Sequence, residues 1–191
     1  MKILVIAEHN NETVKASTFS TINAASQIDQ NIDVLVVGSD CNNVTSELSN
    51  TQYIKKILLI DDTKFQNPIA ENISKIITSC AEEYTHILAP ASTFGKNIMP
   101  RVAALLDVAQ ISDIIKIEGE DTFVRPIYAG NALATVQSHD STKVITVRPT
   151  SFDAVSKEGG NGEIQNLDLD IDISNVEFIG REDTKSDRPE L

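Results

Sequence analysis

Tryptophan is absent from this 191-residue sequence, and the other aromatic residues are few, with three tyrosines and six phenylalanines. The core must therefore be built from isoleucine, valine, leucine and alanine. Cysteine is scarce too, because Cys41 and Cys80 are the only two and show no Cys-X-X-Cys spacing. This argues against a disulfide framework or a thiolate zinc site and is typical of a reducing compartment.

Long apolar runs are also missing from the N-terminus. Residues 3–7 form an apolar run that is too short for a signal peptide or a membrane span. The run instead predicts a buried strand. We expect a cytosolic protein without membrane insertion.

Basic residues are outnumbered, with 16 Lys plus Arg against 28 Asp plus Glu and a formal net charge of −12. A negative surface repels nucleic acids and anionic membranes, which argues against both as partners. Residues 153–191 hold eleven of the acids and four of the bases, and therefore −7 of that charge. The acidity is concentrated near the C-terminus.

The first half of the chain alternates short apolar runs with longer amphipathic stretches. The runs predict strands at residues 3–7, 34–37, 57–60 and 87–89. The stretches predict helices at 13–28, capped by Thr13, at 43–50, at 68–83, with Pro68 in the first turn, and at 96–106. Such alternation indicates βαβ units and a parallel sheet.

The pattern changes after Asp107. Strand-like runs at 122–129, 132–138 and 143–147 follow one another without a helix, and Gly130-Asn131 predicts a tight hairpin turn. We therefore expect an α/β fold: a three-layer, Rossmann-like domain over residues 1–180. Its sheet should be mostly parallel, with an antiparallel C-terminal addition.

The C-terminal part differs from the rest in composition. Residues 156–162 contain three glycines and predict a mobile loop. An alternating pattern then predicts an edge strand with an acidic, solvated face, formed by Leu167, Asp168, Leu169, Asp170, Ile171, Asp172 and Ile173. Residues 181–191 are polar and are expected to form a linker.

Glu8, His9 and Asn10 follow the first predicted strand. Ligands of open α/β sheets bind beyond the carboxyl ends of the strands, so Glu8 and His9 are candidates for acid–base chemistry. The structural alternative is a loop that caps the first helix. No nucleophile accompanies them, which favours the structural alternative.

A second candidate segment, residues 90–97, lies between a strand and a helix. A phosphate-binding P-loop needs glycine where Pro90 stands and serine or threonine where Asn97 stands, so that motif fails. Backbone N–H groups at the helix start could still hold an anion, but capping by Ser92 or Thr93 is favoured. The combined crevice candidates for ligand binding are Glu8, Asn10, Ser92, Lys96 and Asn97.

The remaining charged and titratable residues favour structural interpretations. His86 and His139 are expected to be packed or surface residues rather than metal ligands, and the Asp168, Asp170 and Asp172 spacing does not fit a calcium loop. Three arginines in apolar context are each expected to pair with an acid, within the domain or across an interface: Arg101, Arg125 and Arg148. No catalytic constellation and no metal site are predicted.

Several segments in order resemble one family. They are residues 4–9, 92–107, 111–115, 122–132, 146–152 and 186–191, which include the runs Ser-Thr-Phe-Gly-Lys-Asn and Tyr-Ala-Gly-Asn-Ala. Together they resemble the N-terminal domain of the electron transfer flavoprotein alpha subunit, over essentially the whole chain.

The resemblance implies an electron carrier rather than an enzyme. It implies a heterodimer with a beta subunit. This heterodimer would carry FAD and pass electrons from flavin dehydrogenases, including acyl-CoA dehydrogenases, to a quinone oxidoreductase. It further implies that residues 181–191 lead to a C-terminal FAD-binding domain absent from this sequence, so that the fragment alone binds no FAD. The expected location is the bacterial cytoplasm, or the mitochondrial matrix in a eukaryote, although no transit peptide is present.

Two functional hypotheses therefore remain open. The first is a scaffold and interaction domain of the flavoprotein alpha subunit. The second is an adenine-nucleotide-binding module or hydrolase that uses the crevice candidates at the strand ends.

Overall fold

The computed structural model describes residues 1–169, 176 and 178–180, and places ten strands of this part in two sheets. The larger sheet consists of β1 (Ile3–Ile6), β2 (Ile32–Gly38), β3 (Ile54–Asp61), β4 (His86–Pro90), β5 (Gln110–Ile114), β9 (Lys143–Val147) and β10 (Glu163–Asn166). Its order is β10-β3-β2-β1-β4-β9-β5, and every neighbouring pair is parallel. The smaller sheet is antiparallel and consists of β6 (Lys116–Ile117), β7 (Thr122–Ile127) and β8 (Ala132–Gln137).

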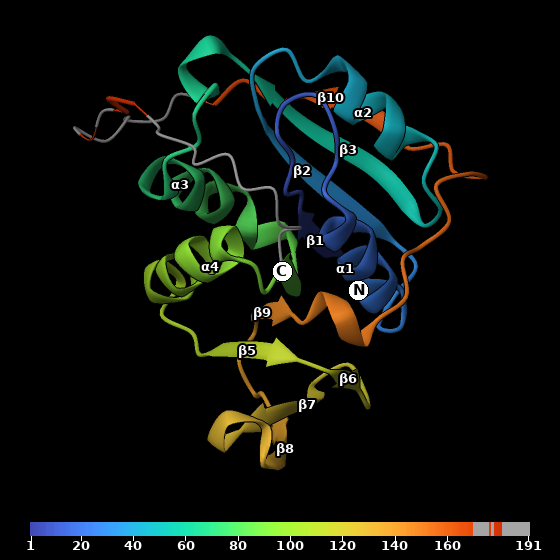
Figure 1. The fold of residues 1–191 in the computed structure, drawn as a ribbon, viewed down its shortest axis with the longest axis vertical. Coiled ribbons are helices and arrows are strands. Elements are labelled where there is room, and N and C mark those ends of the chain that lie inside the picture. The colour runs from blue at the N-terminus through green and yellow to red at the C-terminus, as the bar shows by residue number, and fades with distance from the viewer. Residues whose placement is uncertain (170–175, 177, 181–191) are drawn as a thin grey trace, which may run out of the picture.

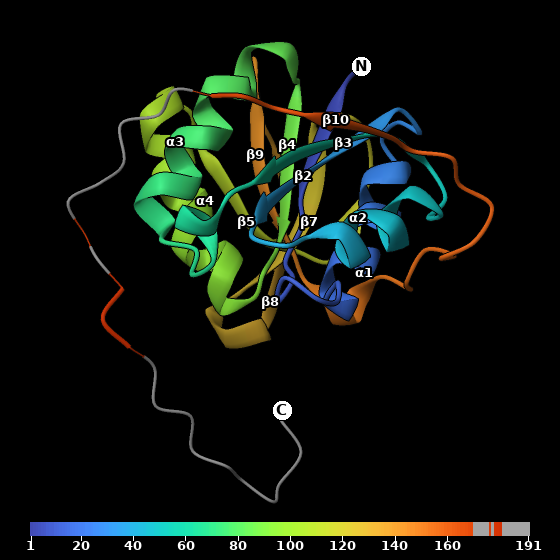
Figure 2. The same ribbon diagram turned by 90° about the horizontal axis from the view of Figure 1, so that it is seen from above.

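Helices cover both faces of the large sheet. Figures 1 and 2 show α1 (Ala16–Ser26) and α2 (Asn42–Ser49) on one face, and α3 (Ala70–Cys80) and α4 (Thr93–Leu106) on the other. Short 3-10 helices complete the described elements: η1 (Thr63–Phe65), η2 (Ala81–Glu83), η3 (Tyr128–Gly130) and η4 (Pro149–Ser151). This arrangement confirms the predicted α/β fold class.

The two-sided cover explains the apolar run at the N-terminus. Ile3 and Val5 of β1 pack into the core cluster that includes Phe19 of α1. Leu4 and Ile6 pack into a separate cluster with α3 and α4 on the opposite face. A strand buried on both faces needs apolar residues at every position rather than at alternate ones.

The start of α1 differs from the prediction. The helix begins at Ala16 after the N-cap residue Lys15, which makes no side-chain cap. The predicted cap, Thr13, is wrong because its hydroxyl and backbone N–H both donate to Asn10 Oδ1, at 3.1 and 2.7 Å. The third helix also begins later than predicted: α3 starts at Ala70, so Pro68 precedes it.

The antiparallel addition is smaller than predicted. Residues 143–147 form β9, which lies inside the large sheet and pairs in parallel with both β4 and β5. Strand β5 was missed because a bulge between Ile111 and Ile114 separates its two buried isoleucines by three positions and hides the period of two. Beyond this edge, β7 and β8 form the hairpin at the bottom of Figure 1.

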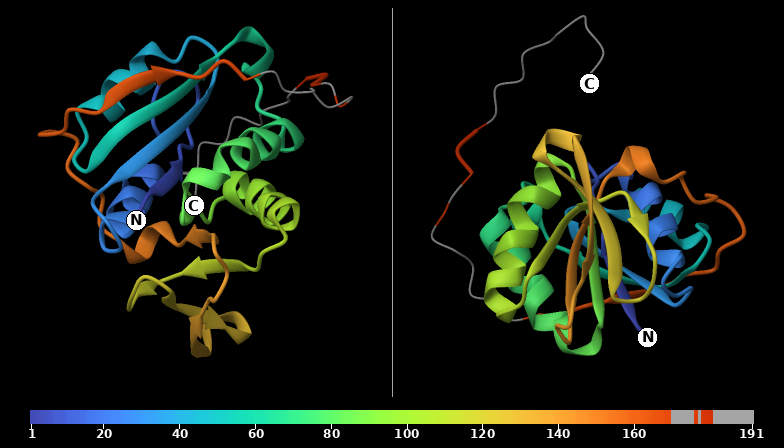
Figure 3. Two further views of the ribbon diagram at one scale, coloured as in Figure 1. Left: turned by 180° about the vertical axis from the view of Figure 1, so that it is seen from behind. Right: turned by 90° about the horizontal axis from the view of Figure 1, so that it is seen from below.

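The C-terminal strand also starts earlier than predicted. Sheet pairing involves Glu163–Asn166, which lie beside β3, as Figure 3 shows from behind. Leu167 and Leu169 follow the strand and pack against the core cluster of α3 and α4. The predicted strand positions 171 and 173, and the predicted linker 181–191, lie outside the described residues.

The glycine-rich segment 156–162 is attached to the body, in contrast to the mobile loop that was predicted. Gly160 and Gly162 donate their N–H groups to the carbonyl oxygens of Asn50 and Ser49, at 2.8 and 2.9 Å. In the part of the chain that the structure describes, no helix combines the length and apolar character that a membrane crossing requires.

Candidate functional site

The candidate residues lie at the carboxyl edge of the large sheet, where the chain order reverses. From β1 the chain proceeds to β2 and β3 on one side, whereas β4 lies on the other side of β1. Such a switch point is where ligands of open α/β sheets bind. Glu8 and Asn10 follow β1, and Ser92, Lys96 and Asn97 follow β4, so the predicted residues do flank this point.

Glu8 is engaged in holding the start of α1. Its carboxylate Oε2 accepts a hydrogen bond from Ser17 Oγ at 3.1 Å. Its backbone carbonyl accepts from the Lys15 N–H at 2.9 Å and from Thr18 Oγ1 at 3.1 Å. These bonds fix the entry of the helix, which supports the structural alternative for Glu8.

Asn10 shapes the loop between β1 and α1. Its Oδ1 accepts from the backbone N–H groups of Glu12 and Thr13, at 3.1 and 2.7 Å. Asparagine often stabilises tight turns in this way. The acceptor that a ligand would need is therefore already in use.

Ser92 is the N-cap of α4. Its Oγ accepts from the Gly95 N–H at 3.4 Å, which confirms the capping interpretation. A Cβ at Gly95 would lie 1.9 Å from the Pro90 carbonyl oxygen, so only glycine fits there. Lys96 and Asn97 are exposed on the outer surface of α4. Three of the five candidates, Glu8, Asn10 and Ser92, thus make hydrogen bonds within their own loops and helix starts.

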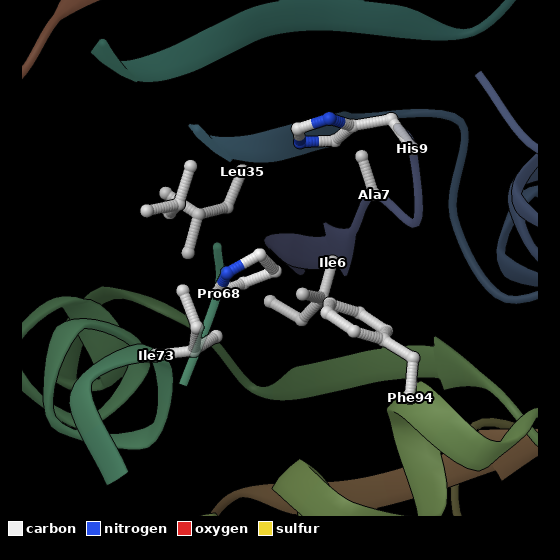
Figure 4. A pocket seen from close by; sticks show the side chains of 8 residues that line it. Ile6, Ala7, His9, Leu35, Pro68, Ile73 and Phe94 are labelled. Atoms are coloured by element: carbon white, nitrogen blue, oxygen red, sulfur yellow. The ribbon is translucent and has the colours of Figure 1, made fainter. Parts of the chain in front are cut away.

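A small apolar pocket lies between the two candidate segments. Figure 4 shows His9, Pro68 and Phe94 around it, over a floor of aliphatic side chains. The lining residues are Ile6, Ala7, His9, Leu35, Val37, Pro68, Ile73 and Phe94. Its interior volume is about 10 Å³, room for about one water molecule. The pocket cannot admit an adenine or a flavin ring in this conformation.

His9 is the titratable group at this pocket. Burial lowers the pKa of His9 to about 4, and a hydrogen bond to the Val37 carbonyl offsets this only partly. The Asn11 N–H donates to His9 Nδ1 at 3.1 Å. His9 is therefore neutral near pH 7, and its Nδ1 is not available as a base.

Two further residues at this edge were not singled out by the sequence. A Cβ at Gly38 would lie 2.3 Å from Asn11 Oδ1 and 2.6 Å from Cys41 Sγ, so any larger residue would displace these two side chains. The Asp61 carboxylate accepts from the backbone N–H groups of Asp40 and Cys41, at 2.7 and 3.1 Å. Both residues close strands in the sequence, but only their three-dimensional neighbours reveal these contacts.

The two other histidines, His86 and His139, differ in exposure. His86 is 1% exposed and bonds through Nε2 to the Glu120 carbonyl at 2.6 Å, so it is packed, whereas His139 is exposed. Among the described residues, no group of three or more His, Cys, Asp or Glu side chains is arranged to hold a metal ion.

The arginine pairings are confirmed for two of the three arginines. Arg101 pairs with Glu71 at 2.8 Å. Arg148 makes a two-pronged pair with Asp113, with Nε at 3.1 Å from Oδ1. For Arg125 the buried Nε has no hydrogen-bond partner among the described residues, and pairing across an interface stays a prediction.

Comparisons with known proteins identify one family and several similar proteins. The family described as "Electron transfer flavoprotein domain" matches residues 3–172. The electron transfer flavoprotein subunit alpha of Pseudomonas aeruginosa is 48% identical over 191 residues, which cover 100% of this chain and 62% of that protein. The mitochondrial alpha subunit of Dictyostelium discoideum is 43% identical over 204 residues, covering 98% of this chain and 58% of that protein. The alpha subunit of Bradyrhizobium diazoefficiens is 44% identical over 191 residues, which cover 100% of this chain and 60% of that protein.

The chain therefore spans about three fifths of the length of these curated relatives. The family match extends from β1 through β10, and so includes both sheets and the switch point. From this match and these identities, the chain belongs to the electron transfer flavoprotein family, and the relatives named here are alpha subunits.

Proposed function

We propose that this chain is the N-terminal scaffold and interaction domain of an electron transfer flavoprotein alpha subunit. The complete protein would be a heterodimer with a beta subunit and would contain FAD. It would carry electrons from flavin dehydrogenases, such as acyl-CoA dehydrogenases, to a quinone oxidoreductase. The observation that supports this most is the family match over residues 3–172, together with 48% identity to an alpha subunit.

The state of the carboxyl edge supports a scaffold role. The polar side-chain groups of Glu8, Asn10 and Ser92 make hydrogen bonds within their own loops and helix starts. The pocket beside them has room for about one water molecule and does not fit an isoalloxazine ring. We therefore assign none of the FAD contacts to the described residues.

The β7–β8 hairpin supports an interaction role. Tyr128 is 80% exposed and Leu133 is 63% exposed on this hairpin. Apolar side chains that gather on a protruding element often mark a protein interface. We propose that the beta subunit covers this hairpin.

The relatives also support a proposal for the location. Those described above come from bacteria and from mitochondria. We propose the cytoplasm for a bacterial source and the mitochondrial matrix for a eukaryotic one.

Flavin absorbance tests the assignment of FAD. The purified 191-residue chain should be colourless near 450 nm, because the pocket between the two candidate segments is too small for the flavin. The complete alpha subunit of Pseudomonas aeruginosa, coexpressed with its beta subunit, is the positive control. Stoichiometric flavin absorbance from the 191-residue chain alone would contradict the proposal.

The nucleotide hypothesis has less support. Calorimetric titration with AMP and ATP separates it from the scaffold role, because a nucleotide module should release measurable heat at millimolar ligand or below. We expect no saturable heat. Saturable binding that is lost in a Lys96→Ala variant would favour the nucleotide module instead.

A further inference from the structure

Four strands of the described residues lie at the edges of the two sheets. Strands β10 and β5 end the large sheet, and β6 and β8 end the small one. An edge strand leaves a row of backbone N–H and C=O groups without partners in its sheet, and these groups can pair with a strand of another chain. Natural proteins protect such edges with charged residues, proline, bulges or very short strands.

Three of the four edges carry protection of this kind. Strand β10 begins with Glu163, and β5 contains Asp113 and the bulge between Ile111 and Ile114. Strand β6 has only two residues, of which one is Lys116. Each of these edges therefore discourages the addition of a further strand.

Strand β8 has none of these features. Its sequence, Ala-Leu-Ala-Thr-Val-Gln, contains no charged residue, no proline and no glycine, and its six residues pair with β7 without a bulge. The alternate side chains of Leu133, Thr135 and Gln137 are exposed. Figures 1 and 3 show β8 at the bottom of the molecule, farther from the large sheet than β7. The chain thus presents one regular, uncharged and accessible sheet edge among its described strands.

Two copies of β8 are complementary to each other. In an antiparallel pair about a twofold axis, one residue lies opposite its own copy, and residues equally far on either side of it lie opposite each other. With the axis at Thr135, threonine faces threonine, which is a favourable cross-strand pair, and Leu133 faces Gln137. No like charges oppose each other there, although each chain has a net charge of −12 that makes two copies repel over most of their surface.

We propose that two copies of this chain associate through β8 when the beta subunit is absent. The two strands pair antiparallel and join the two three-stranded sheets into one. This pairing gives the free edge groups their hydrogen-bond partners and covers part of Leu133, which is 63% exposed. Because one strand pair is a small contact, we expect a dissociation constant of about 10–100 µM.

Sedimentation velocity tests the association. The 191-residue chain is measured from about 1 µM to about 500 µM in about 0.15 M sodium chloride, which screens the net charge. The expected result is a monomer–dimer equilibrium in which half of the chain is dimeric at a total concentration of about 10–100 µM.

Thr135→Lys tests the role of the edge strand. Thr135 is exposed, so the monomer should keep its fold, which circular dichroism checks, but the dimer would bring two lysines opposite each other. Dimerisation should weaken about tenfold or more. Ser46→Lys adds the same charge at an exposed position of α2 and should dimerise like the original chain. Thr135→Val keeps a β-branched side chain and should also retain the dimer.

Amide hydrogen exchange locates the contact in the unaltered chain, and so decides even if Thr135→Lys does not fold. Between about 1 µM and about 500 µM, the β8 amides that face away from β7 should exchange about three- to tenfold more slowly, because most of the chain becomes dimeric. The amides of β10, the other edge, should exchange at the same rate at both concentrations.

Three results would overturn the proposal. They are a monomer at every concentration, a dimer that Thr135→Lys and Ser46→Lys weaken equally, and concentration-dependent protection in β10 instead of β8. None of them bears on the flavoprotein assignment, which is tested by flavin content and by binding of the beta subunit. Conversely, a failure to bind the beta subunit would leave the β8 dimer in place.

Discussion

Position 95 has no room for a side chain. A Cβ there would lie 1.9 Å from the backbone oxygen of Pro90, and a backbone carbonyl cannot turn away as a flexible side chain can. We predict that Gly95→Ala lowers the free energy of unfolding by about 3 kcal/mol, because the strand end and the helix start must move apart. Urea denaturation measures this loss.

Gly119→Ala is the matched control for Gly95→Ala. A Cβ at Gly119 has its nearest neighbours at 4.0 Å, so this variant should remain within about 0.5 kcal/mol of the original chain. Equal stabilities of the two variants would mean that the turn after β4 adapts freely.

His9 gives the chain a pH dependence. Its folded-state pKa of about 4 lies below the ordinary histidine value of 6.5, so the unfolded chain binds the proton more tightly. Stability from this residue is therefore complete above the unfolded pKa and is lost as pH falls from about 6.5 to about 4. We predict that His9→Gln removes about 2.5 kcal/mol of the stability change between about pH 7 and about pH 4.5.

The measurement is urea denaturation at the two pH values for both proteins. His139→Gln, which alters an exposed histidine, is the control and should keep the pH dependence of the original chain. A pH dependence that is identical in His9→Gln and the original chain would show that His9 titrates alike in the folded and unfolded states.

At the scale of elements, β10 has few contacts of its own. Its four residues are exposed, and the Leu167 N–H donates to the Leu59 carbonyl at 2.8 Å just after the strand ends. The apolar attachment comes from Leu167 and Leu169, which pack against the core cluster of α3 and α4. The edge strand is thus held by residues that follow it.

We predict that the double variant Leu167→Ser and Leu169→Ser releases β10 while the rest of the sheet stays intact. Amide hydrogen exchange in β10 and in the β3 amides facing it should accelerate about 10- to 100-fold, whereas β1 and β2 keep their protection. Ile164→Ser changes a residue that is 46% exposed within β10 and serves as the control. Unchanged exchange in the double variant would show that the backbone bonds to β3 suffice.

At the scale of the whole molecule, the β7–β8 hairpin extends the fold beyond β5, as Figure 1 shows. We predict that Tyr128→Ser combined with Leu133→Ser weakens association with the proposed beta-subunit partner about tenfold or more. The stability of the chain alone should change by less than about 0.5 kcal/mol, because both side chains are exposed. Pull-down of a coexpressed beta subunit, followed by titration, measures the association.

Leu105→Ser provides the comparison for the hairpin variant. Leu105 is 56% exposed but lies on α4. If Leu105→Ser weakened the association more than the hairpin variant did, the interface would lie on the helical face instead.

Much of the fold could be predicted because its signals are local. A strand buried on both faces is apolar at every position, as in Ile3–Ile6, and amphipathic helices show their period within one segment. The capping role of Ser92 was predictable for the same reason, since its partner Gly95 is three residues away. The predicted C-terminal strand was displaced because all four residues of β10 are exposed and show no alternation. Strand β5 was missed because a bulge interrupts its alternating pattern.

The sequence by itself determined the alternation of strands and helices, the aliphatic core and the resemblance to the flavoprotein family. Each depends on residues that are close in the chain or on ordered motifs. Only the tertiary structure decided that β9 joins the parallel sheet and that Glu8 holds α1. Only the structure, too, paired Arg148 with Asp113, 35 positions away, and left the Arg125 Nε without a hydrogen-bond partner among the described residues. Such contacts join segments that are distant in the chain, and no local propensity encodes which acid an arginine will meet.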